Sequence, residues 1–306
     1  MTKILANDGI NKAGLQLLEE AGFTVDTQFI PQAELASKIG DYDILLVRSA
    51  TKATAEIIDA GVNLKLIGRG GVGMDNIDVA YAQSKGIEVI NTPGASSQSV
   101  AELVIGTMFS LSRSLFHSHR MMPATGEKDF NVLKKKYGNG QELRGKTLGI
   151  VGFGRIGQSV ASYALGNGMK VIAIDLYSNT VDIIVPIDGF GEAKVSFSPK
   201  RELNDVIDQL DYISLHVPKQ PNGEAVIGEK EFEKMKKGVI IVNAARGGVI
   251  DEDALLKALE SGKVRAIGLD VFENEPAPRK DLLSNEKIAS TPHIGAATDE
   301  AQDRIG

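Results

Sequence analysis

The sequence has 306 residues and no cysteine, which excludes disulfides, thiolate catalysis and metal sites built on sulfur. It also has no basic surplus: 34 Lys and Arg stand against 40 Asp and Glu, a formal net charge of −6 that disfavours a general nucleic-acid binder. No apolar run approaches the ~18 residues of a membrane span, and no cleavable signal pattern follows Met1. We therefore expect a cytoplasmic protein that binds neither nucleic acid nor membrane and holds no metal.

Glycine, in contrast, is abundant, with 33 residues against a usual share of ~7%. Short β-branched runs alternate with helical patterns along the whole chain, and several of these runs are almost wholly apolar, as strands buried on both faces are. This alternation predicts right-handed βαβ units and parallel sheets. The predicted strands are 3–7, 23–29, 44–48, 64–68, 88–91, 147–152, 170–175, 212–217, 239–243, 266–270 and 287–291.

These strands exceed what one sheet comfortably holds, so we predict an α/β protein with two doubly wound parallel sheets. A helix predicted over 97–112 follows the loop Asn91-Thr92-Pro93-Gly94 and is expected to join them, with a domain boundary near Ala95. Two stretches depart from the alternation. The first, 117–140, is expected to be polar and irregular; the second, 181–198, is expected to form an inserted hairpin.

Two segments fit the pattern G-x-G-x-x-G, which chance alone would give roughly 0.4 times at this glycine frequency. In a dinucleotide site, an acidic side chain at the end of the next strand receives the ribose hydroxyls. The segment Gly152 to Gly157 has such an acid, Asp175, whereas after Gly68 to Gly73 the next strand ends in Asn91. The loop at Gly152 is therefore interpreted as the cofactor site, and Asp175 favours NAD because its carboxylate repels the 2′-phosphate of NADP.

The loop at Gly68 needs another explanation. Its backbone amides are predicted to form a small anion-binding nest, with Arg69 inside it and Arg48 ending the neighbouring parallel strand. With Lys52 one turn further on, these cations predict a pocket for a doubly anionic small molecule. Ordinary surface arginines are the alternative interpretation.

Hydride chemistry on an alcohol requires a base and a cation that holds the acid group, roles that suit histidine and arginine. His216 and His293 each follow a strand, at the carboxyl edge where ligands of open α/β sheets bind. Arg246 and Glu275 also follow predicted strands. His117 and His119 have no acidic neighbour in sequence and are interpreted as surface residues. Each candidate alone could be an ordinary loop residue, so the set as a whole carries the prediction.

The motifs Gly152 to Gly157, His216-Val217-Pro218, Val242 to Asp251, Asp270 to Pro276 and Pro292-His293-Ile294-Gly295 resemble, in order and spacing, the D-isomer-specific 2-hydroxyacid dehydrogenase family. The resemblance implies a Rossmann NAD domain, 96–293, inserted in a flavodoxin-like substrate domain formed by 1–95 and 294–306, with the active site in the cleft. It also implies a homodimer that pairs through the region around 117–140.

The resemblance assigns roles residue by residue. His293 would be the acid–base catalyst, Glu275 its partner, and Arg246 the group that grips the substrate carboxylate and carbonyl. The residues implied to bind NAD are Gly152, Gly154, Arg155, Ile156, Gly157, Asp175, His216, Val217, Pro218, Ala244 and Asp270. Those implied to bind substrate are Arg48, Ser49, Lys52, Arg69, Val72, Gly73 and Asn91.

The segments Val47 to Lys52, Gly68 to Asp78 and Asn91-Thr92-Pro93 are similar to the phosphoglycerate dehydrogenase branch of that family. The implied reaction is the NAD-dependent oxidation of D-3-phosphoglycerate to 3-phosphohydroxypyruvate, which opens L-serine biosynthesis. A glyoxylate or hydroxypyruvate reductase is one alternative, and an NAD-sensing corepressor-like protein is another. Long members of the family continue beyond the position of Gly306, so we expect no serine-responsive domain and a shortened helix after Asp299.

Overall fold

The computed structural model describes residues 2–177 and 179–306, and the chain divides into two compact units. Unit 1 comprises Met1–Ser99 and Ala296–Gly306, and unit 2 comprises Val100–Gly295. The chain thus changes unit after residues 99 and 295, whereas the resemblance implied changes after residues 95 and 293.

Unit 1 is built on a five-stranded parallel sheet with the order β2-β1-β3-β4-β5. This is the flavodoxin-like order that was predicted. The strands are β1 (Lys3–Ala6), β2 (Thr24–Asp26), β3 (Ile44–Val47), β4 (Leu66–Arg69) and β5 (Glu88–Asn91). Leu5, Leu45 and Ile67, on three adjacent strands, are fully buried and form the centre of its core.

Five helices cover this sheet: α1 (Lys12–Glu20), α2 (Gln32–Lys38), α3 (Ala55–Ala60), α4 (Val79–Ser84) and α11 (Asp299–Ile305), with a 3-10 turn at Ile39–Asp41. The helix α11 contacts α1, and α3 contacts both α2 and α4. The last residues of the chain are therefore part of the fold of unit 1.

Unit 2 is built on a six-stranded parallel sheet with the order β13-β12-β11-β10-β6-β7. Its strands are β6 (Thr147–Val151), β7 (Lys170–Ile174), β10 (Tyr212–Leu215), β11 (Val239–Asn243), β12 (Val264–Leu269) and β13 (Ile288–Ser290). Every residue of β10 and β11 is buried, as expected for strands covered on both faces. The chain moves outward in opposite directions from β6, so the end of β6 is the topological switch point at which ligands of such sheets bind.

The helices of unit 2 are α5 (Ser97–Arg113, which begins within unit 1), α6 (Leu115–Tyr137), α7 (Arg155–Gly166), α8 (Glu229–Lys234), α9 (Glu252–Glu260) and α10 (Lys280–Leu283), with 3-10 turns at Leu203–Asp205 and Ile207–Gln209. One buried cluster joins α5 and α7 to the sheet, and a second joins α8 and α9 to it. In the part of the chain that the structure describes, no helix has both the length and the apolar character required to cross a bilayer.

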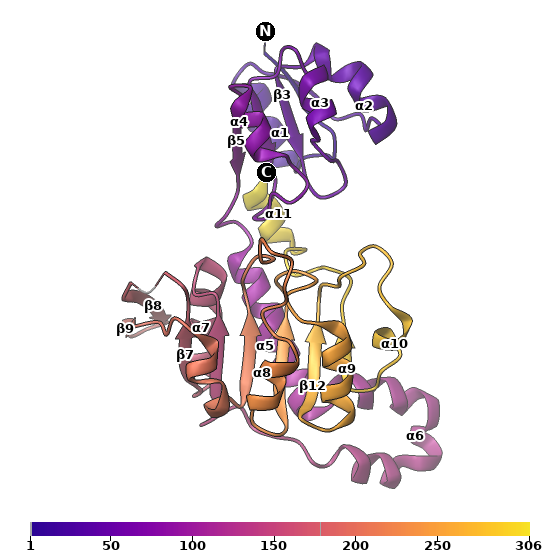
Figure 1. Cartoon of the computed structure of the whole chain (residues 1–306), viewed down its shortest axis with the longest axis vertical. Coiled ribbons are helices and arrows are strands. Elements are labelled where there is room, and N and C mark those ends of the chain that lie inside the picture. Colours follow the sequence, from indigo (N-terminus) through magenta and orange to yellow (C-terminus); the bar gives the residue numbers. More distant parts are fainter. Residues whose placement is uncertain (1, 178) are drawn as a thin grey trace. The chain divides into compact units, whose positions relative to one another are not determined.

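The prediction that 117–140 is irregular was wrong, because residues 115–137 form α6. Pro123 lies inside this helix, and Asp129 has non-helical dihedrals, so that α6 consists of two helical segments that meet at a kink (Figure 1). An interior proline removes one backbone donor and its ring crowds the preceding turn, but the surrounding Met, Ala, Glu, Lys and Leu residues favour helix. The three lysines Lys134 to Lys136 occupy the last turn, where positive charge favours the helix dipole.

The predicted hairpin is confirmed as β8 (Val181–Ile187) and β9 (Gly191–Phe197), which pair antiparallel from Val181↔Phe197 to Ile187↔Gly191. It lies between β7 and β10 in the chain, where the alternation otherwise places a helix and a strand. Among the described residues, a single parallel bridge, Ile174↔Lys200, extends the sheet beyond β7. The hairpin is therefore an insertion next to the predicted ribose-binding Asp175.

Candidate functional site

The predicted cofactor residues of unit 2 collect at the carboxyl edge of its sheet. Gly152, Asp175, His216, Ala244 and Asp270 each follow the last residue of a strand, from β6, β7, β10, β11 and β12 respectively. Parallel strands end at the same edge, so the fold brings this set together around the switch point. His293 follows β13 at the same edge.

The loop after β6 has the shape that a dinucleotide requires. Gly152 has φ +90°, and a Cβ there would clash with the His216 carbonyl, so only glycine fits this turn. A side chain at Gly154 would enter open space, which leaves room for a pyrophosphate against the backbone. The helix α7 begins directly at Arg155, so the first N–H groups of that helix, at Arg155 and Ile156, have no intrahelical acceptor. These residues fit NAD.

The loop at Gly68 differs in one decisive respect: no helix follows it directly. After Gly73 the chain continues through 74–78 before α4 begins at Val79. The Gly71 N–H donates to Thr92 Oγ1 (2.8 Å), and Asn91 Nδ2 donates to the Val72 carbonyl (2.6 Å). Without a helix N-terminus, this loop lacks the positive end that holds a pyrophosphate.

Asp175 is partly buried at the end of β7. Its Oδ2 accepts from the Phe153 N–H (2.7 Å), and its Oδ1 accepts from the Tyr177 N–H (2.9 Å). The carboxylate thus ties the glycine loop to the segment after β7, and each oxygen keeps a lone pair for a further donor. Leu176 and Tyr177, which follow it, are exposed and carry no positive charge.

His216 contacts the end of β6, directly before the glycine loop. Its N–H donates to the Val151 carbonyl (2.7 Å), and its Nε2 lies 2.7 Å from Ser214 Oγ. Its Nδ1 is buried and has no hydrogen-bond partner among the described residues. Burial disfavours the charged ring and lowers the pKa of His216 to about 3, so the ring is neutral under ordinary conditions.

His293 and Glu275 form a pair. His293 Nδ1 lies 2.8 Å from Glu275 Oε2, and Glu275 Oε1 accepts from the Phe272 N–H (2.9 Å). Both side chains are partly exposed, at 52% for His293 and 36% for Glu275. When Nδ1 donates to the carboxylate, Nε2 is the ring nitrogen that remains for a ligand.

A buried aspartate fixes the backbone that carries His293. Asp270, at 3% exposure, accepts through Oδ1 from Thr291 Oγ1 (2.6 Å) and the Ile294 N–H (2.8 Å), and through Oδ2 from the Gly295 N–H (2.9 Å). Between these contacts His293 has φ +55°, a left-handed conformation that is uncommon for a residue with a side chain. Such strain persists only where the surroundings hold it, and Asp270 supplies that restraint.

Arg246 lies on a tight turn after β11. Asn243 closes this turn, because its Oδ1 accepts from the Ala245 N–H and its Nδ2 donates to the Arg246 carbonyl, each at 3.0 Å. Arg246 Nη1 also donates to the Ala245 carbonyl (2.6 Å). The guanidinium is therefore held beside its own backbone at the sheet edge.

A hollow of about 450 Å³ adjoins the His293 and Glu275 pair within unit 2. Apart from the pair, its walls are mostly apolar. They are formed by Phe272, Glu275, Pro276, Pro278, Leu283, Ser290, Thr291, Pro292 and His293. The pair therefore lies at the wall of a cavity of small-molecule size.

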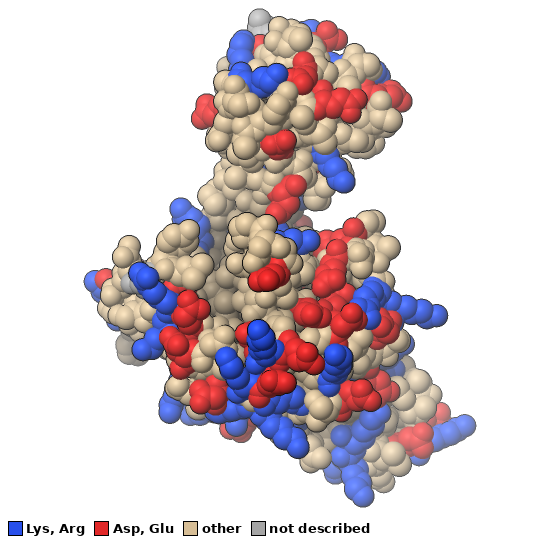
Figure 2. All heavy atoms as spheres, in the orientation of Figure 1, with Lys and Arg blue, Asp and Glu red and all other residues tan. Residues whose placement is uncertain are grey.

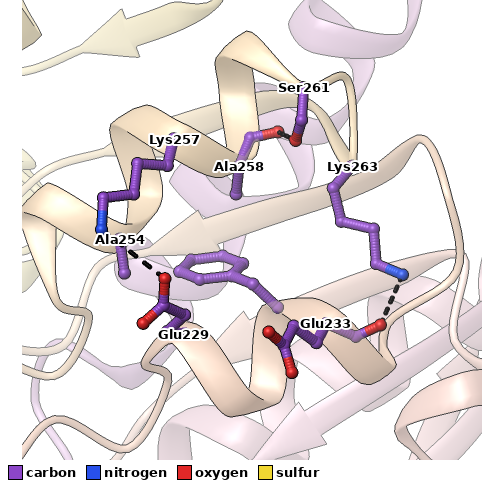
Figure 3. A pocket seen from close by; sticks show the side chains of 8 residues that line it. Glu229, Glu233, Ala254, Lys257, Ala258, Ser261 and Lys263 are labelled. Carbon is purple, nitrogen blue, oxygen red and sulfur yellow. Dashed lines mark hydrogen bonds and ion pairs between the residues drawn. The ribbon is translucent and has the colours of Figure 1, made fainter.

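A second hollow of unit 2, about 340 Å³, lies between α8 and α9, and both lysines that line it have partners (Figure 3). Phe232 lines it, Lys257 Nζ is 3.5 Å from Glu229 Oε1, and Lys263 Nζ donates to the Glu233 carbonyl (2.7 Å). Basic and acidic residues are also interspersed over this face of unit 2 in Figure 2. We interpret this hollow as an ordinary depression of the protein surface rather than a ligand site.

In unit 1 the predicted substrate residues lie at the carboxyl edge of the sheet. Val47 pairs with Arg69, and Arg69 pairs with Asn91, so Arg48, Arg69 and Asn91 stand at the ends of three adjacent strands. The backbone N–H groups of Val72 and Gly73 donate to no acceptor within residues 2–177 and 179–306. Ser49 and Lys52 are exposed on the loop after β3.

Two residues that the sequence did not indicate organise this edge. Asp8, just after β1, accepts through Oδ2 from the N–H groups of Arg48 (2.6 Å) and Thr51 (3.1 Å). Gln302, on α11, accepts a hydrogen bond from Arg48 Nη2, and its own Nε2 donates to the Ala296 carbonyl (2.8 Å). The position of Asp8 directly after an apolar strand was a usable signal, but nothing in the sequence links Gln302 to Arg48.

Residues 105–295 match the family model described as D-isomer specific 2-hydroxyacid dehydrogenase, NAD binding domain. The chain belongs to this family. The dehydrogenase is 46% identical to the hydroxypyruvate reductase of Thermotoga maritima over 99% of this chain and 94% of that protein. It is 43% identical to the D-3-phosphoglycerate dehydrogenase of Methanocaldococcus jannaschii, covering all of this chain and 56% of that protein. The dehydrogenase thus spans little more than half of that relative.

Solved structures agree with this assignment. A glyoxylate reductase from Paecilomyes thermophila superimposes with a TM-score of 0.84 at 32% identity, over 100% of this chain and 92% of that one. The predicted fold class, family and NAD cofactor are therefore confirmed, and the dehydrogenase is an oxidoreductase.

Proposed function

We propose that the dehydrogenase oxidises D-3-phosphoglycerate to 3-phosphohydroxypyruvate with NAD, the step that opens L-serine biosynthesis. The observation that carries the chemistry is the 2.8 Å contact between His293 and Glu275 next to a cavity. The observation that favours a phosphorylated substrate is the placement of Arg48 and Arg69 at adjacent strand ends of unit 1. The 46% identity to a hydroxypyruvate reductase favours reduction of an unphosphorylated 2-keto acid as the second candidate.

The proton chemistry follows from the tautomer of His293. Bound NAD would supply the acceptor for the hydride that leaves C2 of the hydroxy acid. His293 Nε2 takes the hydroxyl proton, and the Glu275 carboxylate stabilises the imidazolium that results while fixing the ring through Nδ1. The guanidinium of Arg246 binds the substrate carboxylate through its two-pronged donor geometry.

The residues proposed to hold the cofactor act mainly through backbone groups. The N–H groups of Arg155 and Ile156 at the start of α7 receive the pyrophosphate beside Gly154, and Gly157 lets the helix pack against β6. Asp175 accepts from the ribose hydroxyls, and its charge favours NAD over NADP. His216, Val217, Pro218, Ala244 and Asp270, at the ends of the next strands, line the remaining length.

The cations of unit 1 are proposed to bind the phosphate. Arg48, Arg69 and Lys52 supply positive charge, and the N–H groups of Val72 and Gly73 supply two donors without an acceptor in the described chain. Ser49 and Asn91 complete this group of donors. A phosphate monoester carries close to two negative charges at neutral pH, so it fits a site with more than one cation.

The test compares kcat/KM for phosphohydroxypyruvate and hydroxypyruvate in the reducing direction, followed at the NADH absorbance. We expect a preference for the phosphorylated acid. R48M should lower that kcat/KM by roughly 10- to 100-fold, the range for a lost charged hydrogen bond, and should change the value for hydroxypyruvate little. K12M, which removes an exposed cation on α1 of the same unit, is the matched control.

Other outcomes of these measurements would support one of the two alternative functions. A preference for hydroxypyruvate or glyoxylate would establish a reductase instead. If no 2-keto acid oxidised NADH although the cofactor bound, the protein would be a non-catalytic, NAD-sensing interaction protein.

We further propose that two copies pair through α6. Its side chains include Phe116, Met122, Phe130 and Val132, which are 44%, 43%, 55% and 65% exposed. Apolar surface of this kind on one long helix favours association over exposure to water. Light scattering of the wild type and of F130E/V132E tests this proposal: we expect a dimer that the double substitution dissociates.

A further inference from the structure

Glu252 is a buried carboxylate on the first turn of α9, with 5% of its surface exposed. Its Oε1 accepts from the Glu273 N–H at 3.0 Å, and its Oε2 is buried without a partner among the described residues. Burial, assisted by the nearby charge of Glu273, raises the pKa of the Glu252 carboxyl. Isolated glutamates are almost never buried, so this position requires an explanation.

Capping of α9 does not explain it. Asp251 is already the N-cap of this helix, and its Oδ1 accepts from the Ala254 N–H (2.9 Å). The Glu252 side chain instead reaches a different segment, 270–276, which is 21 residues further along the chain at Glu273. The helix dipole favours a negative charge in this first turn, which offsets part of the cost of burial.

The segment that Glu252 reaches is the one that carries Glu275. Glu273 lies two residues before Glu275, and Glu275 Oε1 accepts from the Phe272 N–H (2.9 Å) while its Oε2 meets His293 Nδ1 (2.8 Å). The hydrogen bond between Glu252 and the Glu273 N–H thus fixes the backbone of this turn. On either side of Glu273, the Phe272 N–H and the Glu275 side chain form the contacts that orient Glu275 toward His293. A shift of this turn by even 1 Å would lengthen the contact with His293 beyond hydrogen-bond distance.

The segment 270–276 is also restrained by the turn that carries Arg246. A Cβ on Gly247, next to Arg246, would clash with the Phe272 carbonyl, so the Arg246 turn and the segment 270–276 are in backbone contact. Arg279 Nη1 also pairs with Asp253 Oδ1 (2.6 Å), the residue after Glu252, but Asp253 is 77% exposed. An exposed pair of this kind contributes little to stability. Loss of the buried hydrogen bond, in contrast, would leave the Glu273 N–H without an acceptor away from water, which is much more costly.

We propose that Glu252 is a positioning residue for the acid–base pair: through the Glu273 N–H it holds the segment 270–276 so that Glu275 meets His293. This inference rests on the proposed dehydrogenase chemistry for its effect on rate. It adds a residue that touches neither substrate nor cofactor and acts only through Glu275.

The variants separate the hydrogen-bond acceptor from the charge. E252A removes both, E252D keeps the charge but is one methylene too short to reach the Glu273 N–H, and E252Q keeps an acceptor oxygen without the charge. We expect E252A and E252D to lower kcat about tenfold, with KM and the Kd of NADH changed less than twofold. E252Q should retain at least half of the wild-type kcat. D253A, which cuts the exposed contact between α9 and Arg279, is the matched control and should behave like wild type.

A double-mutant cycle tests whether Glu252 acts through Glu275. In an E275Q background, E252A should cause no further loss of kcat, because the two residues belong to one unit. An equal tenfold loss in both backgrounds would overturn the proposal, as would an E252Q variant as slow as E252A or an E252D variant as fast as wild type. E252Q keeps the volume of the site and E252D removes only one methylene, so these two variants test the proposal if E252A does not fold.

An NMR measurement decides the proposal without turnover. The ¹H–¹⁵N resonance of the His293 Nδ1–H, protected by its bond to Glu275, should be present in wild type and E252Q and absent in E252A and E252D. Its persistence in all variants would refute the inference. If the wild type turned over no 2-keto acid, the proposed function would fail, whereas the resonance would still report whether Glu252 holds Glu275 on His293.

Discussion

The neutral ring of His216, whose Nδ1 is buried, is expected to make the stability of unit 2 sensitive to acid. Its pKa is lowered from 6.5 to about 3 by burial, so the folded state resists protonation while the unfolded state accepts it. The stabilising contribution is complete above pH 6.5 and is lost as the pH falls toward 3. At pH 5 the unfolded state gains about 2 kcal/mol from this one ring, a value that changes little for any folded pKa below about 4.

H216Q removes the titration and keeps a polar atom near the Nε2 position that contacts Ser214 Oγ. The substitution has its own fixed cost, so the informative quantity is the change in its effect between pH 8 and pH 5. We expect the difference in unfolding free energy between wild type and H216Q to shift by about 2 kcal/mol in favour of H216Q at pH 5.

Urea unfolding followed by far-UV circular dichroism measures this difference at both pH values. Because His216 lies in unit 2, only the transition of that unit should move. H119Q, the same substitution at an exposed histidine on α6, is the matched control. If wild type and H216Q lost the same free energy between pH 8 and pH 5, the reasoning from burial would be refuted.

Four further outcomes are expected. H293A should lower kcat by about 10²-fold or more, the scale for loss of an acid–base group, and a loss under tenfold would mean that another group moves the proton. D175A should weaken binding of NAD relative to NADP, measured by titration of both cofactors; an unchanged preference would contradict its role. Q302A should lower the preference for the phosphorylated acid about fivefold, because Arg48 loses the hydrogen bond to Gln302, and an unchanged ratio of kcat/KM values would dismiss that link. The effect of E252Q on the melting temperature should be more favourable at pH 7 than at pH 4, because burial raises the pKa of Glu252 and a raised pKa lowers the stability of the wild type as the pH rises; an equal effect at both pH values would contradict this.

The local sequence pattern was sufficient to predict most strands of the two parallel sheets. Apolar runs such as 239–243 became strands with every residue buried, because strands covered on both faces have no polar side to alternate with. The run 23–29 was predicted too long: the strand ends at Asp26, whose side chain accepts from the Gln28 N–H (2.8 Å) and turns the chain away. Side-chain competition of this kind is difficult to weigh from propensity alone.

Within the candidate site, the residues that follow strands were predictable and their supports were not. Gly152 and His293 could be identified because parallel topology gathers strand ends at one edge. The contact between Arg48 and Gln302 joins residues 254 apart, and that between Glu252 and Glu273 depends on how two loops pack. No periodicity in the sequence indicates such contacts, so they could be identified only from the three-dimensional structure.

The division of unit 1 into two stretches of sequence has a consequence for biosynthesis. Asn11 Nδ2 donates to Asp303 Oδ1 (2.8 Å), a contact across 292 residues, and α11 packs on α1. During translation all of unit 2, a contiguous stretch, is synthesised before α11, so every residue of unit 2 exists while unit 1 still lacks its last helix. Unit 1 therefore cannot complete the cationic edge that Gln302 supports until its second stretch of sequence has been synthesised.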